Sequence, residues 1–359
     1  MEFRPNFLAT AIGSLPHKDP VEAVNLVMET LPDAPVWPQL SSRSFREQME
    51  IQCSEGMPCR RVDEEKARVY FITDGDQWDD LADFFEAYAT ALDPEEGTGD
   101  CSALAMSPDY AAGLHAMKDR LAKEKAKRPY AKVQTVGPIT FTLTITDQAK
   151  RALYYNEGFR DMAAKALAMK CRWQIEQFKP YADRVICFMD EPILSAFGSS
   201  TYVSVQRNDV VDILSEMVET VRQGGALSGI HCCGNTEWSI LVDADVDIIN
   251  FDAYEFGETV AMYPEHMKRH LDRGGVLAWG VVPTKASALH DESVESLAAR
   301  YTKLVDHLAN KTGVDKQRIH QQTVITPSCG AGSMSETDAV LVMTHTQKLA
   351  AALREKHGG

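Results

Sequence analysis

Three residues of types that bind metals or carry out thiol chemistry lie together at the end of an apolar segment, which reads LSGIHCC. Successive side chains of a strand point to opposite faces, so His231 and Cys233 would share a face and Cys232 would point away. Three interpretations stay open on these residues alone. They could be packed core residues, a redox pair or metal ligands.

A redox pair fits poorly, because adjacent cysteines form a strained ring when oxidised and the chain has no C-x-x-C motif. A catalytic zinc ion takes about three ligands from His, Cys and carboxylate side chains and keeps one position open. Cys329 ends a later extended run, TVITPSCG, again beside glycine. Cys329 could therefore complete a zinc site with His231 and Cys233, and buried core thiols remain the alternative.

Two carboxylates, Asp190 and Glu191, directly follow the apolar run RVICFM. Acidic side chains at the end of a buried strand could transfer a proton or bind an amine, which makes both residues candidate catalytic groups. They could equally cap the following helix, with Pro192 setting the turn. The first extended run ends in Ile12, Gly13 and Ser14, of which the glycine and the serine are also common turn residues.

Extended runs alternate with amphipathic patterns along most of the chain. Apolar residues recur at three- and four-residue spacings in the predicted helices, which span residues 20–31, 79–92, 159–178, 209–223, 293–313 and 335–357. The predicted extended runs span residues 7–14, 34–40, 67–72, 131–138, 184–192, 227–233, 247–254, 276–282 and 323–330.

This alternation predicts an α/β fold, a (β/α)8 TIM barrel that forms a single catalytic domain over residues 1–359. Nine extended runs are one more than a barrel needs. We therefore expect residues 36–40 or 67–72 to belong to a small N-terminal insertion or hairpin. Chemistry in such barrels gathers at the carboxyl ends of the strands, where the candidate residues above lie.

Composition excludes several classes of function. The net charge is −15, which argues against nucleic acid as a partner because phosphate contacts need clustered lysine and arginine. It also gives no reason to expect an anionic membrane surface as a partner. No apolar run approaches the roughly 20 residues of a membrane-spanning helix, and the first residues lack a signal-peptide pattern. We expect a cytoplasmic protein.

At the candidate residues the chain resembles a known family, the zinc-dependent thiol methyltransferases that share the barrel of uroporphyrinogen decarboxylase. Within it, the resemblance is above all to the catalytic C-terminal domain of cobalamin-independent methionine synthase. AIGSLPH resembles the family's I-G-S-x-P, VGPITF its G-P-[VI]-T, FMDEPILS its D-E-P-x-L and TPSCGAGS its N-P-D-C-G-L. IHCCGN resembles the H-x-C-G-N of the methylcobalamin:coenzyme M methyltransferases. The motifs keep the family order from residue 11 to residue 333.

The resemblance implies that a catalytic zinc ion, Zn²⁺, binds to His231, Cys233 and Cys329. It also implies that two elements hold the amino-acid part of a homocysteine-like thiol. These are Asp190 and residues 12–14, where Ser14 acts with the backbone of Ile12 and Gly13. The implied reaction is methyl transfer to the thiolate of homocysteine, which is the last step of methionine synthesis.

Two departures from the family leave alternatives open. Methionine synthases place a glutamate zinc ligand where this chain has Asn250. Asp252, or less favourably Glu255, could take the place of that glutamate. Alternatively, the site uses only three protein ligands. We also expect no second, N-terminal barrel within these 359 residues, and the family histidine after Gly280 is absent. The methyl donor could therefore be a methylated corrinoid protein as well as methyltetrahydrofolate. The alternative functions are methyl transfer to another thiol, such as coenzyme M, and decarboxylation of the uroporphyrinogen type.

Overall fold

The computed structural model of the chain describes residues 3–75, 77–92 and 97–358, so the remaining residues of the predicted domain 1–359 lie outside the described residues. Within the described part, seven strands form one all-parallel sheet in the order β1-β10-β9-β8-β7-β6-β4. The strands are β1 (Leu8–Ala9), β4 (Arg128–Val136), β6 (Ala182–Asp190), β7 (Leu227–Cys232), β8 (Ile248–Phe251), β9 (Val276–Val282) and β10 (Thr323–Pro327).

Residues 33–39 fill the gap between β1 and β4 and so complete a ring of parallel backbone segments. On one side, the Gln39 amide donates to the Gly13 carbonyl at 3.0 Å. On the other side, the Lys132 amide of β4 donates to the Pro35 carbonyl at 2.8 Å. The segment makes isolated bridges to both neighbours and no regular ladder. Pro35 and Pro38 explain this, since proline has no N–H to donate.

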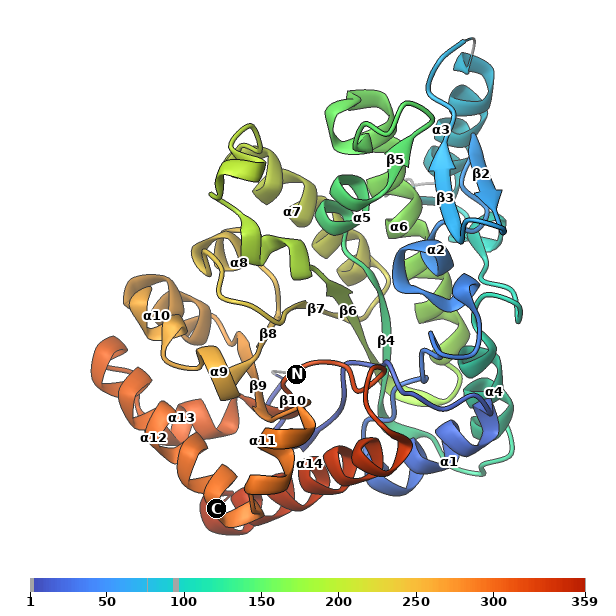
Figure 1. The fold of residues 1–359 in the computed structure, drawn as a ribbon. Helices are drawn as coiled ribbons and strands as arrows, with labels where there is room; N and C mark the ends of the chain where they lie inside the picture. Colours follow the sequence, from blue (N-terminus) through green and yellow to red (C-terminus); the bar gives the residue numbers. More distant parts are fainter. Residues whose placement is uncertain (1–2, 76, 93–96, 359) are drawn as a thin grey trace.

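The longer helices lie outside this ring (Figure 1). They are α1 (Pro20–Thr30), α4 (Ala112–Leu121), α6 (Glu157–Phe178), α7 (Arg207–Gln223), α10 (Pro264–Asp272), α12 (Val294–Thr312) and α14 (Glu336–His357). Shorter helices are α2 (Met49–Cys53), α5 (Pro138–Thr144), α8 (Ser239–Asp243), α9 (Ala253–Phe256), α11 (Ala286–Asp291) and α13 (Lys316–Gln321). Single 3-10 turns are η1 (Phe45–Glu47), η2 (Ser102–Leu104), η3 (Leu153–Tyr155), η4 (Pro192–Ala196), η5 (Ser200–Tyr202) and η6 (Thr259–Met262).

Local sequence signals set the ends of these helices. In α12, the Ser293 hydroxyl accepts from the Ser296 amide, and the Ser296 side chain caps the Ser293 amide in return. The helix ends at Gly313, whose φ of 70° is a left-handed conformation that favours glycine. The six helices expected from apolar spacing are confirmed, with ends that shift by only a few residues.

A separate three-stranded sheet, in the order β2-β3-β5, forms the small insertion. Strand β2 (Arg60–Asp63) pairs with β3 (Arg68–Phe71) as an antiparallel hairpin, and β3 pairs with β5 (Thr146–Asp147) in parallel. Helix α3 (Trp78–Leu92) follows this hairpin along the chain (Figure 1). Of the two runs considered for the insertion, 67–72 belongs to it. The other, 36–40, lies in the barrel ring, and the predicted barrel with a small N-terminal insertion is confirmed.

The interior of the ring holds its own apolar cluster, to which the barrel strands contribute. Its buried members are Phe3, Leu8, Ala34, Ile186, Phe188, Leu227, Ile248, Val276, Ala278 and Val324. Because side chains alternate along a strand, residues two positions further on point into the same interior, nearer the carboxyl ends. Asp190, His231 and Asn250 therefore lie above this cluster, and they are aligned in register on neighbouring strands.

None of the helices in the described part of the chain has the length and apolar character needed to span a bilayer. The cytoplasmic location stays a prediction, as does the assignment of the whole chain to a single domain.

Candidate metal centre

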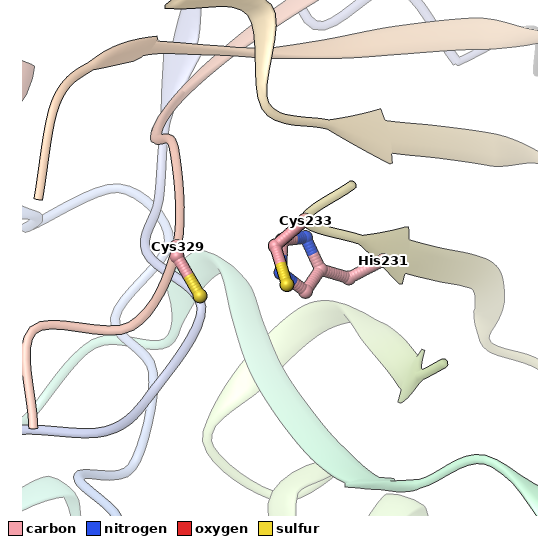
Figure 2. A group of neighbouring side chains, drawn as sticks. All are labelled: His231, Cys233 and Cys329. Carbon is pink, nitrogen blue, oxygen red and sulfur yellow. The ribbon is translucent and has the colours of Figure 1, made fainter. Parts of the chain in front are cut away.

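The three sulfur and imidazole groups singled out in the sequence lie together at the carboxyl ends of the barrel strands. His231 is in β7, Cys233 is the first residue after that strand, and Cys329 comes two residues after β10. One ligand atom from each residue lies within 4.8 Å of those of the other two. Figure 2 shows the side chains pointing toward one another from the two strand ends. Residues almost 100 positions apart are thus brought to one point.

This donor set fits a zinc ion. Thiolate and imidazole are the ligands zinc prefers in proteins. The Nε2 atom of His231 is buried and makes no hydrogen bond to the described residues, as a nitrogen reserved for a metal would. The neighbouring Cys329 thiol and His231 ring lower the pKa of Cys233, which favours the thiolate form that binds zinc. Contact with that sulfur, together with burial, raises the pKa of Cys329.

Cys232 has a different environment, as the strand alternation predicted. Its side chain is fully buried, and its thiol donates to the Gly234 carbonyl at 3.6 Å. Burial raises the pKa of Cys232 to about 12, so it stays a thiol. Cys232 is therefore a packing residue, and the run of three residues 231–233 is divided between the candidate metal centre and the core.

Asn250, which stands where the resemblance expects a glutamate, contacts His231. Its Oδ1 lies 2.5 Å from Nδ1 of His231, and its Nδ2 donates to the Ala278 carbonyl and to the Thr326 hydroxyl, both at 2.9 Å. The Asn250 side chain is fully buried. The amide thus contacts the imidazole at Nδ1, the ring nitrogen other than the Nε2 atom that makes no hydrogen bond to the described residues.

The two acidic candidates for a fourth ligand differ in their surroundings. Asp252 is buried, and its Oδ1 accepts from the Glu255 amide at 2.9 Å, which caps α9. Burial raises the pKa of Asp252 to about 6, and the Glu255 carboxylate and the Cys233 sulfur contribute smaller increases. Glu255 instead pairs with Lys285 at the surface. Neither carboxylate belongs to the group of three ligand atoms, and the role of Asp252 stays a prediction.

Asp190 ends β6 next to His231, its register partner on β7. The residue is 7% exposed, and its Oδ1 is buried without a hydrogen bond to the described residues. Burial raises the pKa of Asp190, and His231 and Lys132 oppose this. A buried carboxylate oxygen without a partner is unfavourable, so this atom is suited to bind a cationic group of a substrate.

Glu191, the adjacent candidate, is held by the start of α5. It accepts hydrogen bonds from the Ile139 amide at 2.9 Å and from the amide and hydroxyl of Thr140, both at 2.7 Å. The side chain is fully buried, and burial raises the pKa of Glu191 to about 7 despite these hydrogen bonds. This is the helix-capping arrangement left open by the sequence, although it caps α5 and not the turn that follows Pro192.

We expect Glu191→Ala to lower the free energy of unfolding by about 2–4 kcal/mol, because it leaves the buried amides of Ile139 and Thr140 unpaired. Denaturant titration of the metal-free protein measures the change. Glu191→Gln keeps one acceptor oxygen and should lose less. Equal stability of Glu191→Ala and the unmodified protein would contradict the capping role.

The segment Ile12–Gly13–Ser14 contacts both β4 and the loop that carries Cys329. The Ser14 hydroxyl accepts from the Gly332 amide at 3.4 Å, and the Ser14 carbonyl accepts from the Ala331 amide at 3.0 Å. Gly13 has a φ of 142°, and a Cβ atom there would lie 2.6 Å from Nε2 of Gln134, so only glycine fits. The predicted substrate-binding segment is thus packed against the loop of a predicted metal ligand.

Lys132 carries a buried charge beneath the site that no sequence motif pointed to. Its Nζ donates to the Ile12 carbonyl at 2.7 Å and lies 4.4 Å from the ring centre of Phe188. Burial lowers the pKa of Lys132 to about 8, and Asp190 opposes this. The available signal was that Lys132 and Gln134, two residues apart in a buried run, are polar residues on one strand face.

Comparisons with known proteins bear on the fold. A scan against models of protein families found no match, and a search of curated proteins found no relative. A solved structure described as a methyltransferase from Methanosarcina mazei is similar, with a TM-score of 0.55 and 13% identity, over 95% of this chain and 86% of that chain. Similarity at this identity shows a shared fold. A GH5-4 broad specificity endoglucanase from Clostridium acetobutylicum reaches a TM-score of only 0.31 at 10% identity, over 72% of this chain and 93% of that chain, which carries no argument.

Proposed function

We propose that the chain is a zinc-dependent S-methyltransferase that transfers a methyl group to the thiolate of homocysteine or a closely related thiol. The observation that carries this proposal is the convergence of His231, Cys233 and Cys329 within 4.8 Å at the barrel mouth. Two thiolates and one imidazole leave a tetrahedral ion one position for a substrate. Additional support comes from the family motifs and from the shared fold with a methyltransferase.

A zinc ion held by His231, Cys233 and Cys329 would lower the pKa of a thiol that it binds, and so would supply the thiolate form of the nucleophile at neutral pH. In the transfer, a sulfur–carbon bond forms while the bond between the methyl group and its donor breaks. The donor leaves with the electron pair of that bond. The protein itself must bring the thiol, the metal and the donor into line, which is a positioning task.

The residues around the metal centre suit the amino-acid part of such a thiol. In our proposal, Asp190 binds the substrate ammonium through the carboxylate oxygen that has no hydrogen bond to the described residues. Residues 12–14 hold the rest of the amino-acid group, beside the loop of Cys329. Glu191 and Lys132 act indirectly in this proposal. Glu191 accepts a hydrogen bond at the start of α5, and Lys132 donates to the Ile12 carbonyl.

The methyl donor is a methylated corrinoid or methyltetrahydrofolate. Coenzyme M, or another thiol without an amino-acid group, is the second candidate acceptor, because the three-ligand set resembles that of the coenzyme M enzymes. A decarboxylase of the uroporphyrinogen type is disfavoured, since it has no need for two cysteines and a histidine within 4.8 Å of one another.

We expect the purified protein to contain about one zinc ion per chain and to form methionine from homocysteine with methylcobalamin or with methyltetrahydrofolate. Elemental analysis measures the zinc, and mass spectrometry of the product measures the transfer. Parallel reactions with coenzyme M identify the acceptor. Absence of zinc would refute the metal centre. Zinc-loaded protein that methylates no thiol with either donor would refute the transferase.

A further inference from the structure

Asn250 is locked in one orientation by its contacts inside the barrel. The Ala278 carbonyl 2.9 Å away can only accept a hydrogen bond, so the nitrogen of the Asn250 amide must face it. The same nitrogen donates its second hydrogen to the Thr326 hydroxyl. The amide oxygen is consequently directed at His231, and no rotation of the amide preserves these three contacts.

This orientation determines where the proton of His231 lies. The Asn250 oxygen can only accept, so Nδ1 of His231, 2.5 Å away, must carry a hydrogen. A neutral imidazole protonated on Nδ1 has its free electron pair on Nε2. That atom is the buried nitrogen without a hydrogen bond to the described residues, and it belongs to the ring that lies beside the two cysteine sulfurs.

We propose that Asn250 is a positioning residue that fixes His231 in the Nδ1-protonated tautomer and thereby selects Nε2 as the metal-binding atom. Histidine ligands of metals usually donate their other N–H to a carboxylate, a backbone carbonyl or water. Here a neutral amide takes that place. It orients the ring without adding a negative charge to a centre that already has two thiolates.

The neutral charge has a consequence for the proposed function, on which this step rests. Two thiolates would balance a divalent ion, and a bound substrate thiolate would make the centre singly negative. A carboxylate at position 250 would add a further negative charge and increase electron donation through His231. With Asn250, the ion would keep more of its positive character and would lower the pKa of a bound thiol more strongly.

The test compares Asn250→Ala, which removes the acceptor, with Asn250→Asp, which keeps an acceptor oxygen. Thr326→Val serves as the control, because it removes one anchor of the amide and leaves the contact with His231 in place. Zinc affinity is measured by competition with a chromogenic chelator. We expect Asn250→Ala to bind zinc roughly 10–100-fold more weakly, and Asn250→Asp and Thr326→Val to retain most of the affinity. Circular dichroism of the metal-free proteins verifies that each variant is folded.

Nitrogen NMR of histidine-labelled, zinc-loaded protein gives a readout that a purely structural role would not alter. The resonances of His231 are assigned by their absence from His231→Gln. We expect a protected Nδ1–H signal in the unmodified protein, and its loss or rapid exchange in Asn250→Ala. Unchanged zinc affinity in Asn250→Ala, or a proton found on Nε2 with the metal on Nδ1, would overturn the inference. If zinc binding behaves as expected but no thiol is methylated, the inference stands and the proposed function fails.

Discussion

Replacing Cys329 by serine is expected to weaken zinc binding by a factor of roughly 10²–10⁴ and to reduce methyl transfer to background. The estimate treats the binding energy of a protein-bound zinc ion, about 10–16 kcal/mol, as divided over three ligands, so that the loss of one costs roughly 3–5 kcal/mol. The reason is that Cys329, in the loop after β10, is the proposed ligand on the opposite side of the centre from His231 and Cys233 (Figure 2). Zinc content after dialysis against a chelator measures the loss.

Cys232→Ser is the matched control. The substitution is chemically identical and lies next to Cys233, but the Cys232 side chain is buried away from the centre with its thiol on the Gly234 carbonyl. We expect this variant to keep its zinc. Full zinc retention in Cys329→Ser, or equal loss in the two variants, would contradict the assignment of the three ligands.

Asp190→Asn should retain zinc but lose about 2–4 kcal/mol of substrate recognition, a decrease in kcat/KM of roughly 30-fold to 1,000-fold for an amino-acid thiol. The reason is that Asp190 is the buried carboxylate with an oxygen that has no hydrogen bond to the described residues, next to His231. An ammonium bound there would be desolvated, and replacing the carboxylate by an amide leaves that charge unpaired. Steady-state kinetics on the homocysteine reaction measure the loss.

A thiol with the same chain but without the amino group separates this role from general damage to the site. The unmodified protein and Asp190→Asn should differ much less with that thiol. Equal losses with both thiols would show that Asp190 does not bind the ammonium. Because burial raises the pKa of Asp190, KM for the amino-acid thiol should also increase as the pH falls through that raised pKa, and Asp190→Asn should lack this dependence.

The regular elements were predictable because their signals are local. Amphipathic spacing and capping residues define α12 and α14, and continuous apolar runs define the strands β6 and β9. The segment 36–40 could not be assigned in this way. Its prolines break the ladder that defines a strand. Only its two neighbours in space, β4 and the segment Gly13–Ser14 that follows β1, show that it belongs to the barrel.

The roles of the two adjacent carboxylates show the same limit. Asp190 and Glu191 follow the same apolar run, and alternation places them on opposite faces of the strand. Which of them faces the metal centre, and which meets the start of α5, depends on the register of β6 against β7 and on the position of a helix 50 residues earlier. The sequence did not indicate a role for Lys132, because Asp190, the carboxylate that interacts electrostatically with it, is distant in sequence.

The sequence by itself determined the barrel class, the position of the candidate residues at the strand ends, and the shared face of His231 and Cys233, since each of these follows from periodicity or from a motif. Only the tertiary structure decided what those residues meet. It places Cys329 beside His231 and Cys233, and it shows that Asn250, at the position where a glutamate ligand was expected, is a hydrogen-bond partner of His231. The physical reason is that ligand sets and hydrogen-bond partners depend on distances between strands, and strand order and register arise from packing of the whole barrel.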